Sequence, residues 1–358
     1  MHGLWNLQTL WFVLICVLWI GFLFLEGFDF GVGMLLRFVG RNPDEKREVI
    51  HSIGPVWDGN EVWLLTAGGA TFAAFPNWYA SMFSGFYLAL FLMLVGLIIR
   101  GVSFEFWGKV DSPRWRNVWE WTLGIGSFIP ALLVGVAFAN LIHGVSLSPQ
   151  GNYTGSFFDL LNPYALLGGV TTLLLCIGHG ATFLSLRTID PVKQRAAAIS
   201  RIVLPLAALA VIGFVIWTLA DSSNRTIGLW IASIVAIVAV AAAAGLATQG
   251  RSGLSFIAGG LGIASVVAGW FFALYPNVMV DSNDSAYNLT VWNAASNHYT
   301  LVVMTVVALI LVPIVLIYQI WTYYVFRHRI GRGGALPKLG NMLSDPAKPT
   351  PPAAGTKV

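Results

Sequence analysis

Long apolar stretches separated by short polar segments run through most of the chain. A helix needs about 20 apolar residues to cross a bilayer, and about nine stretches approach that length. The pattern therefore predicts an all-α polytopic membrane protein with about nine transmembrane helices. These stretches lie near residues 7–37, 58–75, 78–100, 117–142, 163–187, 199–220, 227–247, 253–275 and 298–326.

Basic residues follow every second stretch, beginning with the first. The segments 143–162 and 276–297, on the other side, contain no Lys or Arg. The positive-inside rule then places the N-terminus outside and the C-terminus in the cytoplasm. The first stretch lacks the charged start and small-residue cleavage site of a signal peptide, so we expect it to be a retained helix.

Composition supports the same class of protein. Of the 358 residues, 57% are hydrophobic and only 10% are charged, whereas a soluble domain carries roughly 25% charged residues. The net charge of +4 is spread over short loops, which does not indicate a nucleic-acid partner. We expect an N-terminal helix bundle over 1–190, scaffold helices over 191–330 and a disordered cytoplasmic tail over 331–358.

Two carboxylates interrupt the first apolar stretch. Glu26 and Asp29 are three residues apart and so lie on one face of a helix. An ionisable group within a membrane is costly unless it is paired or faces a wet cavity, which makes such a pair a functional-site hypothesis. The alternative is that both carboxylates only cap a neighbouring helix.

The second stretch opens with a polar and aromatic motif, Gly-Pro-Val-Trp-Asp-Gly-Asn-Glu-Val-Trp over 54–63. Asp58 is suited to be the N-cap of this helix, and Glu61 lies at the capping-box distance. A purely structural role is therefore a strong alternative here. Against it, Trp57, Asn60 and Trp63 supply more polar and aromatic groups than a cap requires.

Arg100 ends the third stretch. An arginine at a cytoplasmic helix end usually extends to the interface, but this one can equally pair with Asp58 at the same level of the membrane. The acids then form a chain open to the cytoplasm. Such a chain is what a proton relay needs, because neighbouring charge and burial allow some carboxyls to hold a proton.

Metal or haem ligands are sparse. Of the six histidines, only His179 lies deep in an apolar stretch, and haem needs one or two axial ligands. A lone buried histidine is more often a hydrogen-bonded core residue. The spacing of Cys and His predicts no zinc or iron–sulfur site, and Cys16 and Cys176 lie in apolar stretches as small hydrophobes. Any redox cofactor is therefore expected in another subunit.

Several segments together resemble subunit II of cytochrome bd-type quinol oxidases. They include Glu-Gly-Phe-Asp-Phe-Gly-Val-Gly-Met (26–34), the motif at 54–64, Thr-Ala-Gly-Gly-Ala-Thr-Phe-Ala-Ala-Phe-Pro (66–76), Phe-Ser-Gly-Phe-Tyr (83–87) and Pro-Arg-Trp-Arg-Asn-Val-Trp (113–119). The resemblance covers nearly the whole chain and is strongest before about residue 190. It implies a multi-pass protein of the bacterial cytoplasmic membrane whose helices pack against a haem-bearing subunit I.

The same resemblance implies a function. Subunit I would hold haem b and haem d, or b-type haems only, and the complex would oxidise a quinol and reduce dioxygen to water without pumping protons. Subunit II would bind no haem and would contribute part of the path for protons from the cytoplasm. Small single-span subunits, lipid and quinone are further partners to expect.

The site residues follow partly from the resemblance and partly from our own inference. Asp58 matches the relay carboxylate of the family, with Arg100 as its neighbour. Extending that path to Glu26, Asp29 and Glu61 is inferred from the residues. Position 26 departs from the aspartate of some members but keeps the carboxylate.

Two other functions remain open from the sequence. A proton- or cation-coupled transporter also uses buried carboxylates, but transporters usually have two related halves with broken helices, and here the acids crowd the N-terminal half. A purely structural membrane partner differs only in that Asp58 does not matter for turnover.

Overall fold

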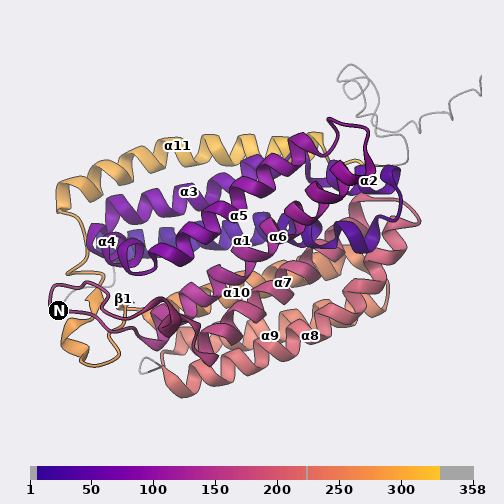
Figure 1. The fold of residues 1–358 in the computed structure, drawn as a ribbon. Helices are drawn as coiled ribbons and strands as arrows, with labels where there is room; N and C mark the ends of the chain where they lie inside the picture. Colours follow the sequence, from indigo (N-terminus) through magenta and orange to yellow (C-terminus); the bar gives the residue numbers. More distant parts are fainter. Residues whose placement is uncertain (1–5, 223–224, 331–358) are drawn as a thin grey trace, which may run out of the picture.

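The computed structural model describes residues 6–222 and 225–330, so the tail predicted to be disordered, 331–358, lies outside the described residues. The described chain is an elongated bundle of roughly parallel helices, with a small cap of loops and short strands at one end (Figure 1). The α-helices are α1 (Leu7–Val39), α2 (Pro43–Ile53), α3 (Trp57–Ala74), α4 (Pro76–Gly85), α5 (Tyr87–Phe106), α6 (Pro113–His143), α7 (Pro163–Arg187), α8 (Val192–Asp221), α9 (Ile227–Thr248), α10 (Ser252–Leu274) and α11 (His298–Val325). The cap contains η1 (Phe157–Leu161), β1 (Asn277–Met279), η2 (Ser285–Tyr287) and β2 (Leu289–Thr290), and β1 pairs with β2 in antiparallel orientation.

The prediction of an all-α polytopic membrane protein is confirmed. Among the described helices, eight are long and apolar enough to cross a bilayer: α1 and α5 to α11. The second predicted span is the 18-residue helix α3, which is not one of these eight and carries both Asp58 and Glu61 near its start. A count of nine spans therefore stays a prediction, as does the orientation.

The third predicted span, 78–100, is wrong as a single helix. The structure divides this region into α4 and α5, with the break at Phe86. Pro76 begins α4 at a position where its missing N–H is not needed, and α4 ends after ten residues. Such a helix is about 15 Å long, too short to cross a bilayer, so the span begins at Tyr87.

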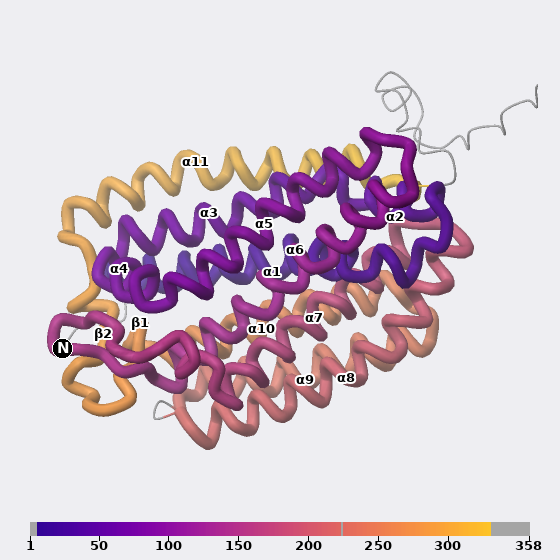
Figure 2. Tube along the Cα trace, viewed as in Figure 1, coloured from indigo at the N-terminus to yellow at the C-terminus, as the bar shows by residue number. Residues whose placement is uncertain are grey.

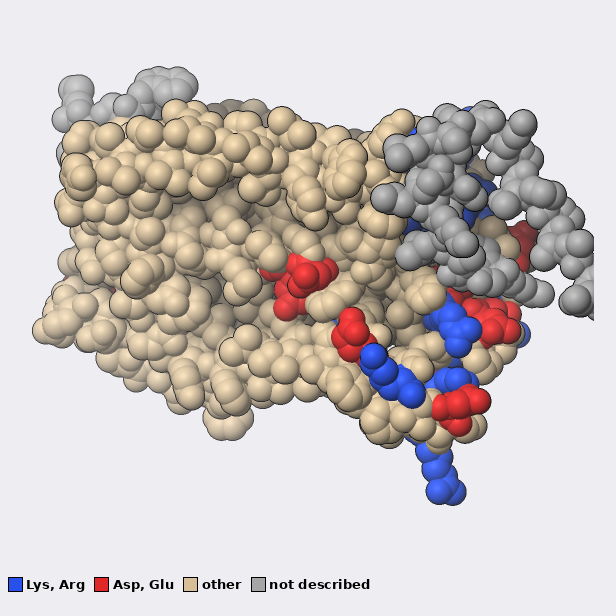
Figure 3. Space-filling view, turned by 90° about the horizontal axis from the view of Figure 1, so that it is seen from above, with Lys and Arg blue, Asp and Glu red and all other residues tan. Residues whose placement is uncertain are grey.

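Charged side chains gather at the end of the bundle where α2 lies. The C-terminal ends of α1, α5, α7, α9 and α11 meet at this end (Figures 1 and 2). In the view onto the α11 side, Lys and Arg lie there, while the rest of the face is almost uncharged apart from a group of acidic side chains part of the way along (Figure 3). This distribution fits the predicted cytoplasmic side.

Small residues let α1 approach its neighbours closely. A Cβ added to Gly31 of α1 would lie 2.8 Å from the Cα of Gly180 in α7, so the two backbones are in direct contact. A Cβ at Gly33 would lie 3.0 Å from the Cβ of Ser127 in α6. Close backbone approach of this kind is how helices gain packing contacts in a membrane, and it fixes the part of α1 that carries the two buried acids.

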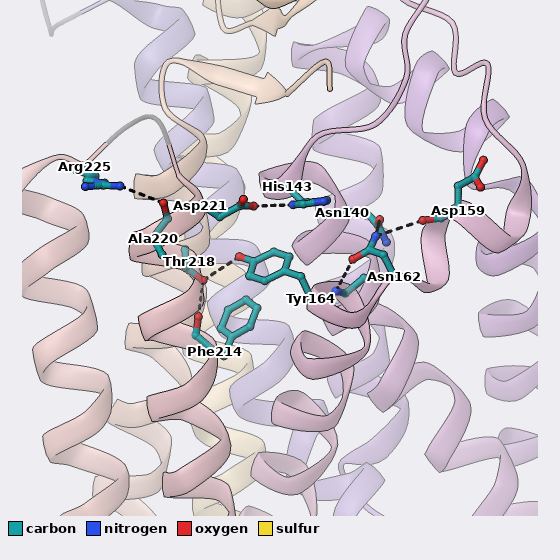
Figure 4. A network of polar contacts seen from close by, with 11 residues as sticks. Asn140, His143, Asp159, Asn162, Tyr164, Phe214, Thr218, Ala220, Asp221 and Arg225 are labelled. Carbon is teal, nitrogen blue, oxygen red and sulfur yellow. Dashed lines mark hydrogen bonds and ion pairs between the residues drawn. The ribbon is translucent and has the colours of Figure 1, made fainter. Parts of the chain in front are cut away.

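Polar side chains join α6, α7 and α8 at the opposite end (Figure 4). The buried Asn140 donates to the carbonyl oxygens of Val136 and Leu160 at 2.9 and 2.8 Å and accepts from Asn162 at 2.8 Å. The Tyr164 and Thr218 hydroxyls lie 2.8 Å apart, and His143 contacts Asp221 at 2.5 Å. The buried members need these bonds, because a polar group without a partner is destabilising in an apolar interior.

Helix α11 lies along one side of the bundle, next to α3 (Figures 1 and 2). In its most apolar window only 6% of the residues are buried. Near its start, Trp11 of α1 donates its indole N–H to the Thr305 hydroxyl at 3.0 Å. Most of this helix therefore presents an apolar surface to whatever surrounds the chain.

Candidate functional site

Arg100 is the centre of a buried ion cluster. Its side chain is fully buried on α5, and it forms ion pairs with Glu26 of α1 and, at 3.3 Å, with Glu61 of α3. The prediction that it extends to the interface or pairs with Asp58 is wrong. The guanidinium is held inside because two carboxylates from two other helices reach it, and they offset the unfavourable burial of a cation.

Aromatic rings surround the rest of the guanidinium. Its carbon lies 5.1 Å from the ring centre of Phe30, 5.2 Å from that of Phe104 and 5.9 Å from that of Trp57. Trp57 in turn packs on Phe104, with ring centres 4.8 Å apart. Aromatic faces attract a cation, most strongly when water is excluded. Trp57, predicted as a supporting residue, therefore covers the buried charge.

Glu26 and Asp29 lie side by side beneath this cation. Both are fully buried, and their spacing places them on one face of α1. An ionised carboxylate in an apolar interior is costly without a cation, and Arg100 pairs with Glu26. One buried cation therefore serves two buried carboxyl groups, an arrangement suited to binding a proton.

Asn60 of α3 is a hydrogen-bond donor to Asp29. Its side-chain nitrogen donates to Asp29 Oδ2 at 2.7 Å. Several neighbouring buried atoms make no hydrogen bond within the described part of the chain: Glu26 Oε2, Asp29 Oδ1, and Arg100 Nε and Nη2. Buried polar atoms are usually satisfied by protein or by ordered water, so this cluster is a polar interior suited to water.

Asp58 is at the open edge of the site. It is exposed in the first turn of α3, and it is close enough to Glu61 to act on that carboxylate electrostatically. The predicted N-cap role is wrong: the N-cap is Val56, with no side-chain cap bond, because the helix begins one residue before Asp58. Asp58 and Glu61, the latter 22% exposed, therefore lie between the surface and Arg100.

Trp63 serves packing. A Cβ at Gly21 of α1 would overlap the Trp63 ring, so the indole fills the space that this glycine leaves between α1 and α3. Within the described part of the chain, its indole forms no hydrogen bond with the acid cluster. Its predicted supporting role is therefore limited to holding the two helices that carry Glu26 and Glu61.

Two site residues were missed in the sequence. Gln319 and Tyr323 of α11 both donate to the side-chain oxygen of Asn60, at 3.1 and 2.9 Å. The glutamine in the last third of the stretch 298–326 was the available signal, because a polar side chain in a membrane helix usually has a partner.

His179 is a core residue, as its isolation predicted. It is buried in α7, its Nε2 contacts the Phe24 carbonyl oxygen at 3.2 Å, and its ring stacks on Phe256 with centres 4.2 Å apart. Over residues 6–222 and 225–330, no group of three or more His, Cys, Asp or Glu side chains is placed to hold a metal ion.

Comparison with known proteins places the chain in a family. Residues 7–326 match the family model of cytochrome bd terminal oxidase subunit II. The cytochrome bd ubiquinol oxidase subunit 2 of Bacillus subtilis is 45% identical over 91% of this chain and 97% of its own length. The cytochrome bd-I ubiquinol oxidase subunit 2 of Escherichia coli K12 is 41% identical over 90% and 95%.

A solved structure shows the same fold. A chain of the bd oxidase from Geobacillus thermodenitrificans superposes with a TM-score of 0.73 over 89% of this chain and 96% of its own, at 17% identity. At that identity the likeness shows the fold alone, whereas the family match and the two relatives cover nearly the full length of the sequence. The chain therefore belongs to the cytochrome bd terminal oxidase subunit II family.

Proposed function

We propose that this chain, as subunit II of a terminal oxidase, carries protons from the cytoplasm toward the oxygen-reducing subunit. Membership of the family makes the chain part of an oxidoreductase complex of the bacterial cytoplasmic membrane and excludes the transporter alternative. The named relatives are ubiquinol oxidases. By analogy, the complex would oxidise a quinol and reduce dioxygen at haem b and haem d, or at b-type haems only, in subunit I.

One observation carries the proton path. Ionisable side chains follow one another from the exposed Asp58 through Glu61 and Arg100 to the buried Glu26 and Asp29. A proton taken up at Asp58 neutralises that carboxylate and passes to Glu61. It then reaches Glu26 or Asp29 through water at the polar atoms of the cluster that have no partner in the described part of the chain. Each carboxyl returns to its starting state once the proton moves on.

Arg100 makes these transfers possible in a dry interior. Without a cation, two or three buried carboxylates could not remain ionised. With Arg100 between Glu26 and Glu61, a carboxylate on either side is compensated while the other binds a proton. The arginine itself stays charged, because its guanidinium does not lose a proton in proteins.

The depth of the pair fits uptake from the basic end. Asp29 lies ten residues before Val39, where α1 ends, which is about 15 Å along a helix. The pair is thus about half a bilayer from the end that bears the Lys and Arg side chains, so a short series of carboxyl groups is enough to reach it.

The exposed apolar surface around Asp58 is the surface we assign to subunit I. Exposed side chains there include Val62, Leu65 and Phe72 of α3, and α11 adds more. In the assembled oxidase the haem-bearing chain would lie on this surface, beyond the first turn of α3 where Asp58 takes up the proton. Small single-span subunits, lipid and quinone would contact the remaining surface.

Replacement of single carboxylates separates a proton path from a structural role. In the purified complex, Asp58→Asn and Asp29→Asn are expected to lower quinol-driven oxygen uptake by about a hundredfold or more, the usual range for loss of a proton-transfer group, with haem content unchanged. Glu105→Gln, an exposed carboxylate of α5 outside the chain of contacts, serves as the control. Normal turnover in a fully assembled Asp29→Asn complex would leave only the structural role.

A further inference from the structure

The C-terminal helix reaches the buried acids through a single amide. Gln319 and Tyr323 are four residues apart and so lie on one face of α11. Both donate to Asn60 Oδ1, at 3.1 and 2.9 Å. The other end of the same carboxamide donates to Asp29 Oδ2 at 2.7 Å. A continuous line of hydrogen bonds thus joins α11 to the buried Asp29.

The two donors determine which way the carboxamide points. An amide has an acceptor end and a donor end, and which one faces a neighbour is set by the hydrogen bonds around it. The Asn60 NH₂ group faces Asp29 and the Leu25 carbonyl oxygen 3.5 Å away, which can only accept, and its oxygen takes the two donors from α11. In the reversed orientation its oxygen would face these acceptors, and the Gln319 amide and Tyr323 hydroxyl would have to turn so that they accept from the NH₂ group.

We propose that Gln319 and Tyr323 are positioning residues for the proton path, which hold Asn60 so that it donates to Asp29. This inference rests on the proposed function of the acid cluster. A hydrogen bond from Asn60 stabilises the ionised form of Asp29 over the protonated form. The docking of α11 therefore determines how readily the Glu26–Asp29 pair releases its proton.

Because α11 has few packing contacts, its two hydrogen bonds to Asn60 are important for its position. Only 6% of its most apolar window is buried, so side-chain packing contributes little to its position. At its cytoplasmic end, Arg187 donates to the His328 carbonyl oxygen at 2.5 Å and Arg329 donates to that of Leu186 at 3.1 Å. Together with the bonds to Asn60, these contacts hold the inner half of the helix against α3 and α7.

The test uses the intact oxidase with hydroxyl and amide groups removed from α11. The double variant Gln319→Leu/Tyr323→Phe removes both donors, and Tyr323→Phe alone removes one oxygen atom and leaves Gln319 in place. The matched control is Tyr318→Phe, which deletes a hydroxyl from an exposed position of the same helix. The measurements are haem content, oxygen uptake as a function of pH at saturating quinol and oxygen, and the carboxyl C=O band in infrared difference spectra.

We expect the double variant to lose about tenfold in turnover, the effect of one hydrogen bond to a charged group. It should also shift both the pH profile and the carboxyl band, and Tyr323→Phe should give a smaller change in the same direction. Tyr318→Phe should match the wild type. If the double variant fails to assemble haem, the positioning role is judged from the turnover, pH profile and carboxyl band of Tyr323→Phe alone.

An unchanged pH profile and carboxyl band in an assembled donor variant would overturn the positioning role. The parent proposal is tested separately by Asp29→Asn. If Asp29→Asn is impaired while the α11 variants behave as wild type, only the positioning role falls. If Asp29→Asn turns over normally, the proton path itself falls.

Discussion

Removal of the buried cation tests the ion cluster most directly. Arg100→Met keeps much of the side-chain volume among Phe30, Trp57 and Phe104 but deletes the charge. Glu26 is then left fully buried without its cation, while Glu61 remains 22% exposed and can be hydrated. The two lost ion pairs should therefore contribute very unequally.

The magnitude follows from that difference in burial. Breaking a buried ion pair by removing one partner destabilises a protein by about 3–5 kcal/mol, whereas a solvent-accessible pair contributes about 0–1 kcal/mol. We therefore expect a loss of about 4 kcal/mol, almost all of it from Glu26. At about 2 °C per kcal/mol for a chain of this size, the unfolding midpoint should fall by about 8 °C.

The assay is thermal unfolding of the purified complex, followed by the haem absorbance and by the helical circular dichroism. Arg114→Met, which removes an exposed arginine, is the control and should change little. Adding Glu26→Gln to Arg100→Met should recover about 2–4 kcal/mol, because Glu26 is then no longer a buried anion without its cation. The reasoning is refuted if Arg100→Met is as mild as the control, or if the second substitution makes the loss worse.

Three further changes test the fold in other parts of the bundle. Hydrogen bonds from Arg195 hold the pKa of Glu45 at about 2, below its ordinary 4.5, so about 2–3 kcal/mol of stability should be present above pH 4.5 and disappear as the pH falls through 2. Denaturant unfolding at several pH values should show this component in the wild type and not in Glu45→Gln. Gly31→Ala should destabilise by at least 1–3 kcal/mol through overpacking and lower the yield of assembled oxidase, whereas Gly68→Ala, whose Cβ meets nothing within 4 Å, should not. Asn140→Leu should lower the unfolding midpoint, with a loss of about 1–3 kcal/mol for partners left unpaired.

Hydropathy was sufficient for the helices whose ends coincide with changes in polarity. The stretches 163–187 and 227–247 agree closely with α7 and α9. It failed where a break lies inside an apolar run, as at Phe86, because only the small residues Ser84 and Gly85 mark the change from α4 to α5. Pairing of Glu26 with Asp29 was also predictable, since spacing within one helix fixes which side chains share a face.

Contacts between distant helices were not accessible from the sequence. The partner of Arg100 depends on how α1, α3 and α5 are rotated about their axes, and the apolar residues of these helices restrict that rotation only weakly. Membership of Asn60 in the site was predicted, yet the donors from α11 lie about 260 residues away in the chain. Their presence becomes visible only once α11 is placed beside α3.

The direct contact of α1 with α7 at Gly31 and Gly180 has a consequence for motion. Backbones in contact leave no room for one helix to slide or bend against the other, so amide protons around Glu26 and Asp29 should exchange with solvent only when the whole bundle opens. Helix α11, with little buried surface, should exchange through small local openings. Glu26 and Asp29 thus lie on a rigid, tightly packed helix. Helix α11, which orients Asn60, is the more mobile element.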